Sequence, residues 1–182
     1  MKILCVIDCQ NDFITGALRN EEAIKKIPNI VEKIRKFDGD RICVTTDTHF
    51  DNYLETREGI ALPVKHCIAG SDGWNIEPNV KAALHDASLR NISVIYIEKP
   101  TFGSYDLVNN LRLTYGRYAD VSIELIGFCT DICVVSNAIL LKAAFYNNAD
   151  IFVDASCCAG VTPETHDAAL KTMKMCQINI ID

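Results

Sequence analysis

The chain has 182 residues, of which 49% are hydrophobic and 23% are charged, and its formal net charge is −6. These values are typical of a compact globule, and we expect residues 1–182 to form a single domain. The negative charge disfavours nucleic acid and anionic membranes as partners, because both attract clustered positive charge. No apolar stretch of the sequence is long enough to span a bilayer.

The nine cysteines indicate the redox environment of the protein. Their number is odd, and the first residues of the chain are typical of a strand rather than of a signal peptide. We therefore expect free thiols in a reducing compartment, and hence a cytoplasmic protein. The cysteine spacing includes no paired C-x-x-C motifs, which disfavours a structural zinc site.

Short apolar segments rich in β-branched residues predict strands buried on both faces, at residues 3–7, 41–46, 93–98, 121–126, 150–153 and 177–180. Helical patterns lie between most of them, at residues 28–37, 77–90, 104–114, 131–146 and 163–175. Two of these helices are predicted to begin at Pro28 and Pro163, because proline fits the first turn of a helix better than its interior. The alternation predicts a three-layer α/β fold, in which helices cover both faces of a mainly parallel sheet.

Residues 47–74 form the longest stretch without periodicity, and a loop of that length in a compact domain is usually functional. After the first strand the chain reads Asp-Cys-Gln-Asn-Asp-Phe, over residues 8–13, where a dinucleotide-binding protein would have G-x-G-x-x-G. A phosphate-binding G-x-x-x-x-G-K-[ST] motif is also missing. The sequence therefore disfavours nucleotide-dependent chemistry.

Reactive side chains follow the predicted strands. Asp8, Asp47 and Lys99 end the first three strands, and Cys133 follows the fourth, after a turn that begins at Gly127. Ligands of open parallel sheets bind outside the carboxyl ends of the strands, so we expect a carboxylate, an ammonium and a thiol to converge there. Each of them alone is explained by a turn, a solvated charge or core packing. Their joint occurrence predicts an active site.

The chemistry that these groups suggest is nucleophilic acyl transfer. Cys133 is predicted to lie in the first turn of a helix capped by Thr130 or Asp131, where the helix dipole favours a thiolate. Lys99 would stabilise the thiolate, and Asp8 would accept the thiol proton and later deliver it to the leaving amine. Backbone amides of the turn would stabilise the oxyanion.

Three motifs carry a resemblance to a known family, at residues 7–13 (Ile-Asp-Cys-Gln-Asn-Asp-Phe), 99–102 (Lys-Pro-Thr-Phe) and 127–134 (Gly-Phe-Cys-Thr-Asp-Ile-Cys-Val). They resemble the isochorismatase-like cysteine hydrolases, which include nicotinamidases. The resemblance implies that Asp8, Lys99 and Cys133 are catalytic, that a cis peptide bond precedes Cys129, and that the amides of Cys129 and Cys133 form the oxyanion hole. It also implies a six-stranded parallel sheet in the order 3-2-1-4-5-6 and a homo-oligomer.

Asp47, His49 and His66 on the long loop are a plausible site for a divalent ion such as zinc, iron or manganese. The alternative is that they are three unrelated polar loop residues. The loop also resembles the metal-binding segment of nicotinamidases, which implies a fourth ligand. We expect Glu58 to be that ligand, with Glu55 as the second choice.

The resemblance further implies apolar walls for a flat aromatic substrate, from Phe13, Leu18, Phe102 and Phe128. Each of these is also an ordinary apolar residue at a strand end. The tryptophan that often precedes the last metal ligand in the family is absent here, where the chain has Leu62 and Pro63. The histidines His85 and His166 receive no chemical role.

The leading prediction is the hydrolysis of nicotinamide to nicotinic acid and ammonia, through a cysteine thioester. A first alternative keeps the fold and the three catalytic residues but acts on another small amide or carbamoyl compound. A second is a binding or redox protein in which Cys133 is a sensor thiol. It is disfavoured because a sensor thiol needs no proton-shuttling carboxylate. A vinyl-ether hydrolase is disfavoured because such relatives lack the nucleophilic cysteine.

Overall fold

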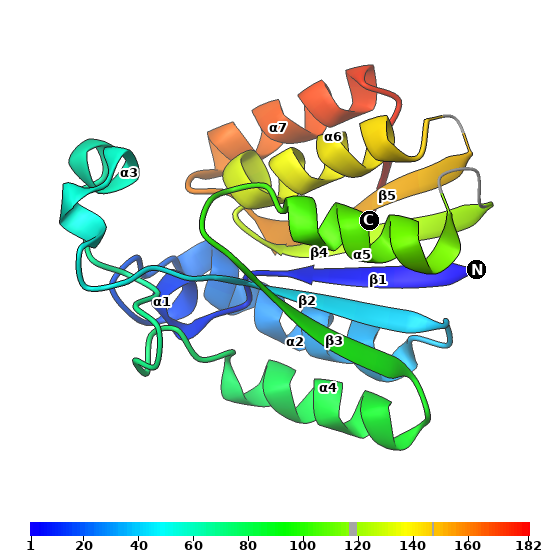
Figure 1. Cartoon of the computed structure of the whole chain (residues 1–182), viewed down its shortest axis with the longest axis horizontal. Coiled ribbons are helices and arrows are strands. Elements are labelled where there is room, and N and C mark those ends of the chain that lie inside the picture. The colour runs from blue at the N-terminus through cyan, green and yellow to red at the C-terminus, as the bar shows by residue number, and fades with distance from the viewer. Residues whose placement is uncertain (117–119, 147) are drawn as a thin grey trace.

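The computed structural model describes residues 1–116, 120–146 and 148–182. Its centre is a six-stranded sheet in the order β3-β2-β1-β4-β5-β6, with all neighbouring strands parallel (Figure 1). The predicted α/β class and strand order are thereby confirmed. The strands are β1 (Lys2–Ile7), β2 (Arg41–Asp47), β3 (Ser93–Lys99), β4 (Val121–Phe128), β5 (Ala149–Ala159) and β6 (Asn179–Ile181).

Helices cover both faces of the sheet, α2 and α4 on one side and α5, α6 and α7 on the other (Figure 1). The helices are α1 (Asn11–Ile14), α2 (Glu21–Lys36), α3 (Arg57–Ala61), α4 (Pro78–Leu89), α5 (Tyr105–Tyr115), α6 (Val135–Ala144) and α7 (Pro163–Met175). A 3₁₀ turn lies at Tyr53–Glu55, and a π-helical turn lies at Thr130–Val134. Across the described parts of the chain, no helix has both the length and the apolar character needed to cross a membrane.

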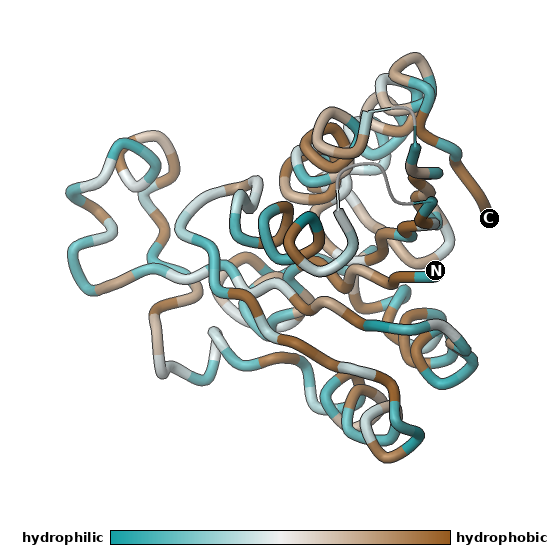
Figure 2. Tube along the Cα trace, turned by 45° about the vertical axis from the view of Figure 1, so that its right-hand side comes forward, coloured by the Kyte–Doolittle hydropathy of each residue, from teal (hydrophilic) through white to brown (hydrophobic). Residues whose placement is uncertain are grey.

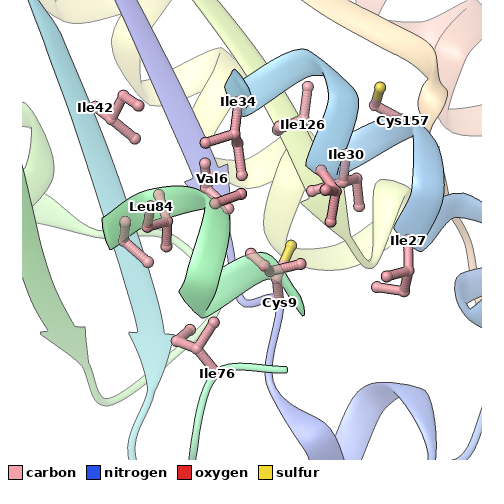
Figure 3. Packing of buried hydrophobic residues seen from close by; sticks show 14 of the residues in the cluster. Val6, Cys9, Ile27, Ile30, Ile34, Ile42, Ile76, Leu84, Ile126 and Cys157 are labelled. Atoms are coloured by element: carbon pink, nitrogen blue, oxygen red, sulfur yellow. The ribbon is translucent and has the colours of Figure 1, made fainter. Parts of the chain in front are cut away.

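The core lies on both faces of the sheet because the strands alternate their side chains between them. In β1, Leu4 and Val6 join the cluster under α2 and α4, whereas Ile3 and Ile7 join the cluster under α5, α6 and α7. Figure 3 shows Val6 packed among side chains of α2 and α4. Figure 2 shows the corresponding hydrophobic bands along the inner strands, with hydrophilic turns at the periphery. The central strands are therefore buried on both of their faces.

The prediction that a helix begins at Pro28 is wrong. Helix α2 begins seven residues earlier, where Asn20 caps it by accepting hydrogen bonds from two first-turn amides. Pro28 lies inside the helix. Its missing amide costs one backbone hydrogen bond. The Asn20 cap and the apolar face of this 16-residue helix, which buries Ile27 and Ile34, together stabilise the helix by more than that loss.

Strand β5 is longer than the predicted residues 150–153, because it continues to Ala159 past a register shift opposite Leu125 and Gly127. The polar residues Asp154 and Ser156 interrupt the apolar pattern of the strand, so the sequence did not predict this extension. Asp154 is buried and forms an ion pair with Lys33 at 2.6 Å. An inward-facing carboxylate that is paired in this way fits a strand interior, although its residue type indicates a strand end.

Candidate active site

Asp8, Lys99 and Cys133 meet at the carboxyl end of the sheet. Asp8 directly follows β1, Lys99 ends β3, and Cys133 lies in the π-helical turn after β4. The Lys99 ammonium nitrogen lies 2.7 Å from a carboxylate oxygen of Asp8 and 3.5 Å from the sulfur of Cys133. All three side chains are buried. The structure therefore brings together the three residues that the strand ends predicted.

Three further groups hold this arrangement in place. The Thr45 hydroxyl donates to Asp8 at 2.7 Å, and Lys99 donates to the carbonyl of Thr101 at 3.0 Å and to Asp47 at 3.2 Å. Thr45 was not among the predicted site residues. Thr45 could have been found as a hydroxyl residue on a buried strand that neighbours the strand before Asp8. A buried hydroxyl needs a hydrogen-bond partner, and Asp8 is within its reach.

The charges of the three groups follow from their burial. Burial disfavours a charged lysine, but Asp8, Cys133 and Asp47 outweigh it and raise the pKa of Lys99. Burial raises the pKa of Asp8, although Lys99 opposes the shift. Burial and the Asp8 charge raise the pKa of Cys133 well above its ordinary value, against the attraction of Lys99.

The raised pKa of the Cys133 thiol disfavours a thiolate, whereas its position at a helix start alone predicts one. The dipole of one turn does not compensate for complete burial beside a carboxylate. A proton acceptor is then needed before the sulfur can attack. Asp8 is the carboxylate that faces it.

The turn that carries Cys133 is closely packed against β1. Gly127 has a φ of 117°, and an added Cβ there would collide with the carbonyl of Ile7. The Phe128–Cys129 peptide bond is cis, as the resemblance implied. The amides of Ile132 and Val134 both donate to the carbonyl of Cys129, at 3.2 and 3.0 Å. The amide of Cys133 lies between these two.

Neither Thr130 nor Asp131 caps a helix as predicted, because both side chains bond instead to residues that follow β5. The Thr130 hydroxyl is hydrogen-bonded to Nδ1 of His166 at 2.8 Å, and Asp131 accepts from the amide of Val161. His166 thus links α7 to the turn of Cys133. No role was predicted for His166, since its partner is 36 residues away along the chain.

The four expected metal ligands also converge. One ligand atom from each of Asp47, His49, Glu58 and His66 lies within 4.8 Å of the others. Nε2 of His49 is 3.0 Å from Asp47 and 3.4 Å from Glu58, and Nε2 of His66 is 3.5 Å from Asp47. Glu58 belongs to this group, whereas Glu55 lies exposed on the preceding 3₁₀ turn.

The chemistry of this group fits a divalent cation. Nε2 of His49 is buried beside two carboxylates, and no other described residue offers it a well-oriented hydrogen bond. Nδ1 of His66 is hydrogen-bonded to the carbonyl of Val64 at 2.8 Å, which leaves Nε2 directed at the cluster. Ligating histidines are typically oriented in this way by their second nitrogen. Two imidazoles and two carboxylates suit zinc, iron or manganese.

Charge and packing support the cluster from outside. Burial opposes the charge of Asp47, but hydrogen bonds to His49 and His66 outweigh it and lower the pKa of that carboxyl. Burial and the charge of Asp47 raise the pKa of Glu58. The ring of Tyr53 packs 4.6 Å from that of His49, between centroids. The negative charges of Asp47 and Glu58 thus repel each other, and the Tyr53 ring packs against one side of the cluster.

Gln10, in the segment between β1 and α1, fixes the backbone of Asp47. Its side-chain amide donates to the carbonyl of Asp47 at 2.9 Å and accepts from the amide of Asp47 at 2.7 Å. It also donates to the carbonyl of Trp74 at 2.9 Å, which closes the long loop. Gln10 belongs to the first of the three motifs, but no role was predicted for it. Its signal was a buried amide directly after an apolar strand.

A cavity of about 610 Å³ opens between the two groups. Cys133, Cys129, Asp47, Glu58 and His66 reach it, together with the apolar side chains of Phe13, Leu18, Leu62, Phe102 and Ile132. Three of the four expected substrate walls therefore line it. Phe128 does not, because its place in β4 turns it to the face under α2, where it is fully buried.

Comparisons with known proteins agree with this geometry. The family model described as the isochorismatase domain matches residues 2–182. The chain belongs to the isochorismatase family. A nicotinamidase/pyrazinamidase of Bacillus subtilis is similar to this family member at 27% identity and a TM-score of 0.84, over 100% of this chain and 99% of that one.

Two other relatives bear on the metal and the substrate. A pyrazinamidase of Pyrococcus horikoshii, solved in complex with zinc, is 25% identical with a TM-score of 0.75, over 100% of this chain and 98% of that one. The nicotinamidase of Saccharomyces cerevisiae is 22% identical over 218 residues, which cover both chains completely. These levels of identity show shared ancestry and leave the substrate to be argued from the site.

Proposed function

We propose that this chain hydrolyses a small carboxamide, with nicotinamide as the first candidate, and releases the carboxylic acid and ammonia. The observation that carries the proposal is the placement of one ammonium, that of Lys99, between Asp8 and Cys133, the last of which lines a cavity. A nucleophile, a base within reach and a fixed cation are what covalent acyl transfer requires.

In the first half of the reaction, Asp8 takes the proton from the thiol of Cys133 while the sulfur attacks the amide carbonyl carbon. The oxyanion that forms accepts hydrogen bonds from the amides of Cys129 and Cys133. As the tetrahedral intermediate collapses, the C–N bond breaks, and Asp8 returns the proton to the departing nitrogen. Ammonia leaves, and an acyl thioester remains on Cys133.

In the second half, Asp8 takes a proton from water, and the hydroxide attacks the thioester carbonyl. The C–S bond breaks, the carboxylic acid departs, and the proton returns to the sulfur. Lys99 keeps its charge throughout, because its two carboxylate partners hold its pKa high. It stabilises the sulfur whenever the sulfur is anionic.

Asp47, His49, Glu58 and His66 are the residues that would hold a divalent ion at the cavity. Such an ion, when bound, supplies a Lewis acid that orients a heteroaromatic nitrogen or a water. The apolar walls, Phe13 and Phe102 among them, suit a flat ring. Zinc in the Pyrococcus horikoshii pyrazinamidase and the activity named for the yeast relative support this assignment.

A second candidate substrate class is a small amide or carbamoyl compound without an aromatic ring. It is favoured by Leu62, which lines the cavity in the region where the family often has tryptophan. A leucine offers a ring less stacking surface than an indole does.

The test is ammonia release from nicotinamide, pyrazinamide and a panel of aliphatic amides and carbamoyl compounds, by the metal-loaded protein. The proposal expects the aromatic carboxamides to give the highest kcat/KM, and a preference for the aliphatic compounds would favour the second class. Release from no compound in the panel would overturn both.

A further inference from the structure

The segment between Lys99 and α5 is an exposed loop that carries two parts of the site. The carbonyl of Thr101 accepts the hydrogen bond of the Lys99 ammonium, and the side chain of Phe102 lines the cavity. Residues 100–102 are exposed. The loop approaches α6 closely, since a Cβ added to Gly103 would lie 2.6 Å from Leu140. The position of Lys99 therefore depends on what fastens this loop to α6.

Asn137 of α6 makes that attachment. Its side-chain oxygen accepts from the amide of Ser104 at 2.9 Å, and its side-chain nitrogen donates to the carbonyl of Phe102 at 3.2 Å. The same nitrogen donates to the carbonyl of Cys133 at 2.8 Å. Asn137 is fully buried. One amide thus satisfies three backbone groups, two on the loop and one on the turn of the nucleophile.

The surroundings of Asn137 make a purely packing role a poor explanation. Its helix neighbours Ala138 and Leu141 belong to the apolar cluster under α6. A buried amide among such neighbours costs free energy unless its hydrogen bonds are made, and an apolar residue would fill the space without that cost. A fully bonded polar group in a core instead selects one arrangement of the elements that it joins. Here those elements carry Lys99 and Cys133.

We propose that Asn137 is a positioning residue, which sets the distance between Lys99 and Cys133 by fastening the loop at residues 100–104 to the nucleophile's carbonyl. The inference rests on the proposed function only in that Lys99 and Cys133 act together. Asn137 is not among the residues that line the cavity, and its hydrogen bonds reach the site through the backbone of Phe102 and Cys133.

The sharpest variant is Asn137→Asp. It keeps the size of the side chain and the acceptor for Ser104, but a second oxygen then faces the carbonyls of Phe102 and Cys133. A displacement of about 1 Å in a site of this kind costs about 100-fold, so we expect kcat to fall by about 10- to 100-fold, with KM changed by less than about threefold. Asn137→Ala, which removes the bonds without adding charge, should show the same split.

Asn109→Asp is the matched control. It makes the same chemical change on α5 at an exposed position, and it should leave kcat and KM unchanged. Kinetics are measured with the best amide of the panel, and thermal unfolding reports the folded fraction of each variant. Expressing kcat per folded molecule separates a change of position from a loss of protein.

A second readout needs no substrate. Iodoacetamide alkylates thiolates, and peptide mass spectrometry follows Cys133 and the exposed Cys176 in the same sample. In Asn137→Asp the rate at Cys133 should fall about as far as kcat falls, because Lys99 no longer stabilises the sulfur, while the rate at Cys176 stays constant. This comparison stands even if no amide is hydrolysed, so it is independent of the proposed function.

Two outcomes would overturn the proposal. One is a folded Asn137→Asp or Asn137→Ala protein whose kcat and Cys133 alkylation both stay within about twofold of wild type. The other is a loss of activity that equals the loss of folded protein, with unchanged alkylation of Cys133 in the molecules that remain folded. The latter would make Asn137 a stabilising residue only.

Discussion

The catalytic group and the metal-binding group lie side by side at one end of the sheet, but different parts of the fold position them. Asp8 and Lys99 stand at the ends of hydrogen-bonded parallel strands, and the register pairs Asp47 with Lys99 directly. Two of the four expected metal ligands, Glu58 and His66, belong instead to a loop whose short helix α3 projects from the body (Figure 1). The sheet therefore fixes the first group, and the loop's own contacts position half of the second.

This difference predicts how the two groups respond to change. A substitution in the catalytic group should reduce turnover strongly, and where it removes a buried charge it should also destabilise the protein. A substitution among the loop ligands should reduce metal affinity while the sheet stays intact.

The largest effect is expected from Cys133→Ala. The nucleophile is lost while its neighbours keep their places, so ammonia release should fall by at least about 10,000-fold, as for other covalent catalysts. The thermal midpoint should change little, because a small side chain is removed. Cys176→Ala, which removes an exposed free cysteine, is the control and should be fully active. An active Cys133→Ala protein would refute the nucleophile assignment.

Lys99→Met should affect both turnover and stability. It leaves Asp8 and Asp47 buried without their shared cation, and loss of one partner from a buried ion pair typically costs about 3–5 kcal/mol in the free energy of unfolding. Urea denaturation measures this cost. The exposed pair of Lys25 with Glu22 provides the control, since Lys25→Met should leave the stability almost unchanged. Equal effects of the two variants would contradict the account.

The loop ligands are tested by comparing Glu58→Gln with Glu55→Gln. We expect Glu58→Gln to weaken zinc binding by about 10- to 100-fold, because it replaces a ligand in the cluster. Glu55 lies outside the cluster, so its variant should bind zinc as wild type does. Equilibrium dialysis with elemental analysis measures both. The assignment fails if the two variants bind alike, and the order reverses if Glu55 is the ligand.

The pH dependence of turnover tests the environment of Asp8. Burial raises the pKa of Asp8, and Asp8 must be ionised to accept the thiol proton. The value of kcat/KM should therefore fall as the pH drops through that raised pKa, by about tenfold for each pH unit below it. Thr45→Val removes a hydrogen bond that favours the ionised form, so it should move this acid limb to higher pH. An acid limb that Thr45→Val leaves in place would argue against Asp8 as the base.

The smallest effects concern the cavity walls. Phe13→Leu should raise KM for an aromatic amide by a few-fold, since the substitution removes about 1 kcal/mol of ring contact. Phe128→Leu should leave KM unchanged and lower the thermal midpoint instead, because Phe128 lies in the core and not in the cavity. A KM effect of Phe128→Leu as large as that of Phe13→Leu would return Phe128 to the substrate site.

The sequence predicted the positions that depend on strand ends. Asp8 and Lys99 could be placed together because parallel strands end at one edge, and no side-chain contact was needed for that inference. The choice between Glu58 and Glu55 could not be made from spacing, because it depends on which side chain of the 3₁₀ turn and α3 reaches Asp47. Phe128 was misplaced for a similar reason, since strand alternation alone does not say which face borders the cavity.

The sequence also could not predict polar contacts between residues that are far apart along the chain. His166, Thr45 and Asn137 bond to partners that are distant along the chain, and a sequence read alone marks such residues only as polar exceptions in apolar segments. The raised pKa of Cys133 also lay beyond prediction, because a helix start indicates a dipole and says nothing of complete burial. Such exceptions are the positions where a buried partner must be sought.

The covalent intermediate provides the most direct test of the central claim. Metal-loaded protein is mixed with the best amide of the panel, quenched in acid during turnover, and mapped by peptide mass spectrometry. The account predicts an acyl group on the sulfur of Cys133, which is lost on prolonged incubation and is missing from Cys133→Ala. Steady turnover with no acyl adduct on Cys133, together with full activity of Cys133→Ala, would contradict it.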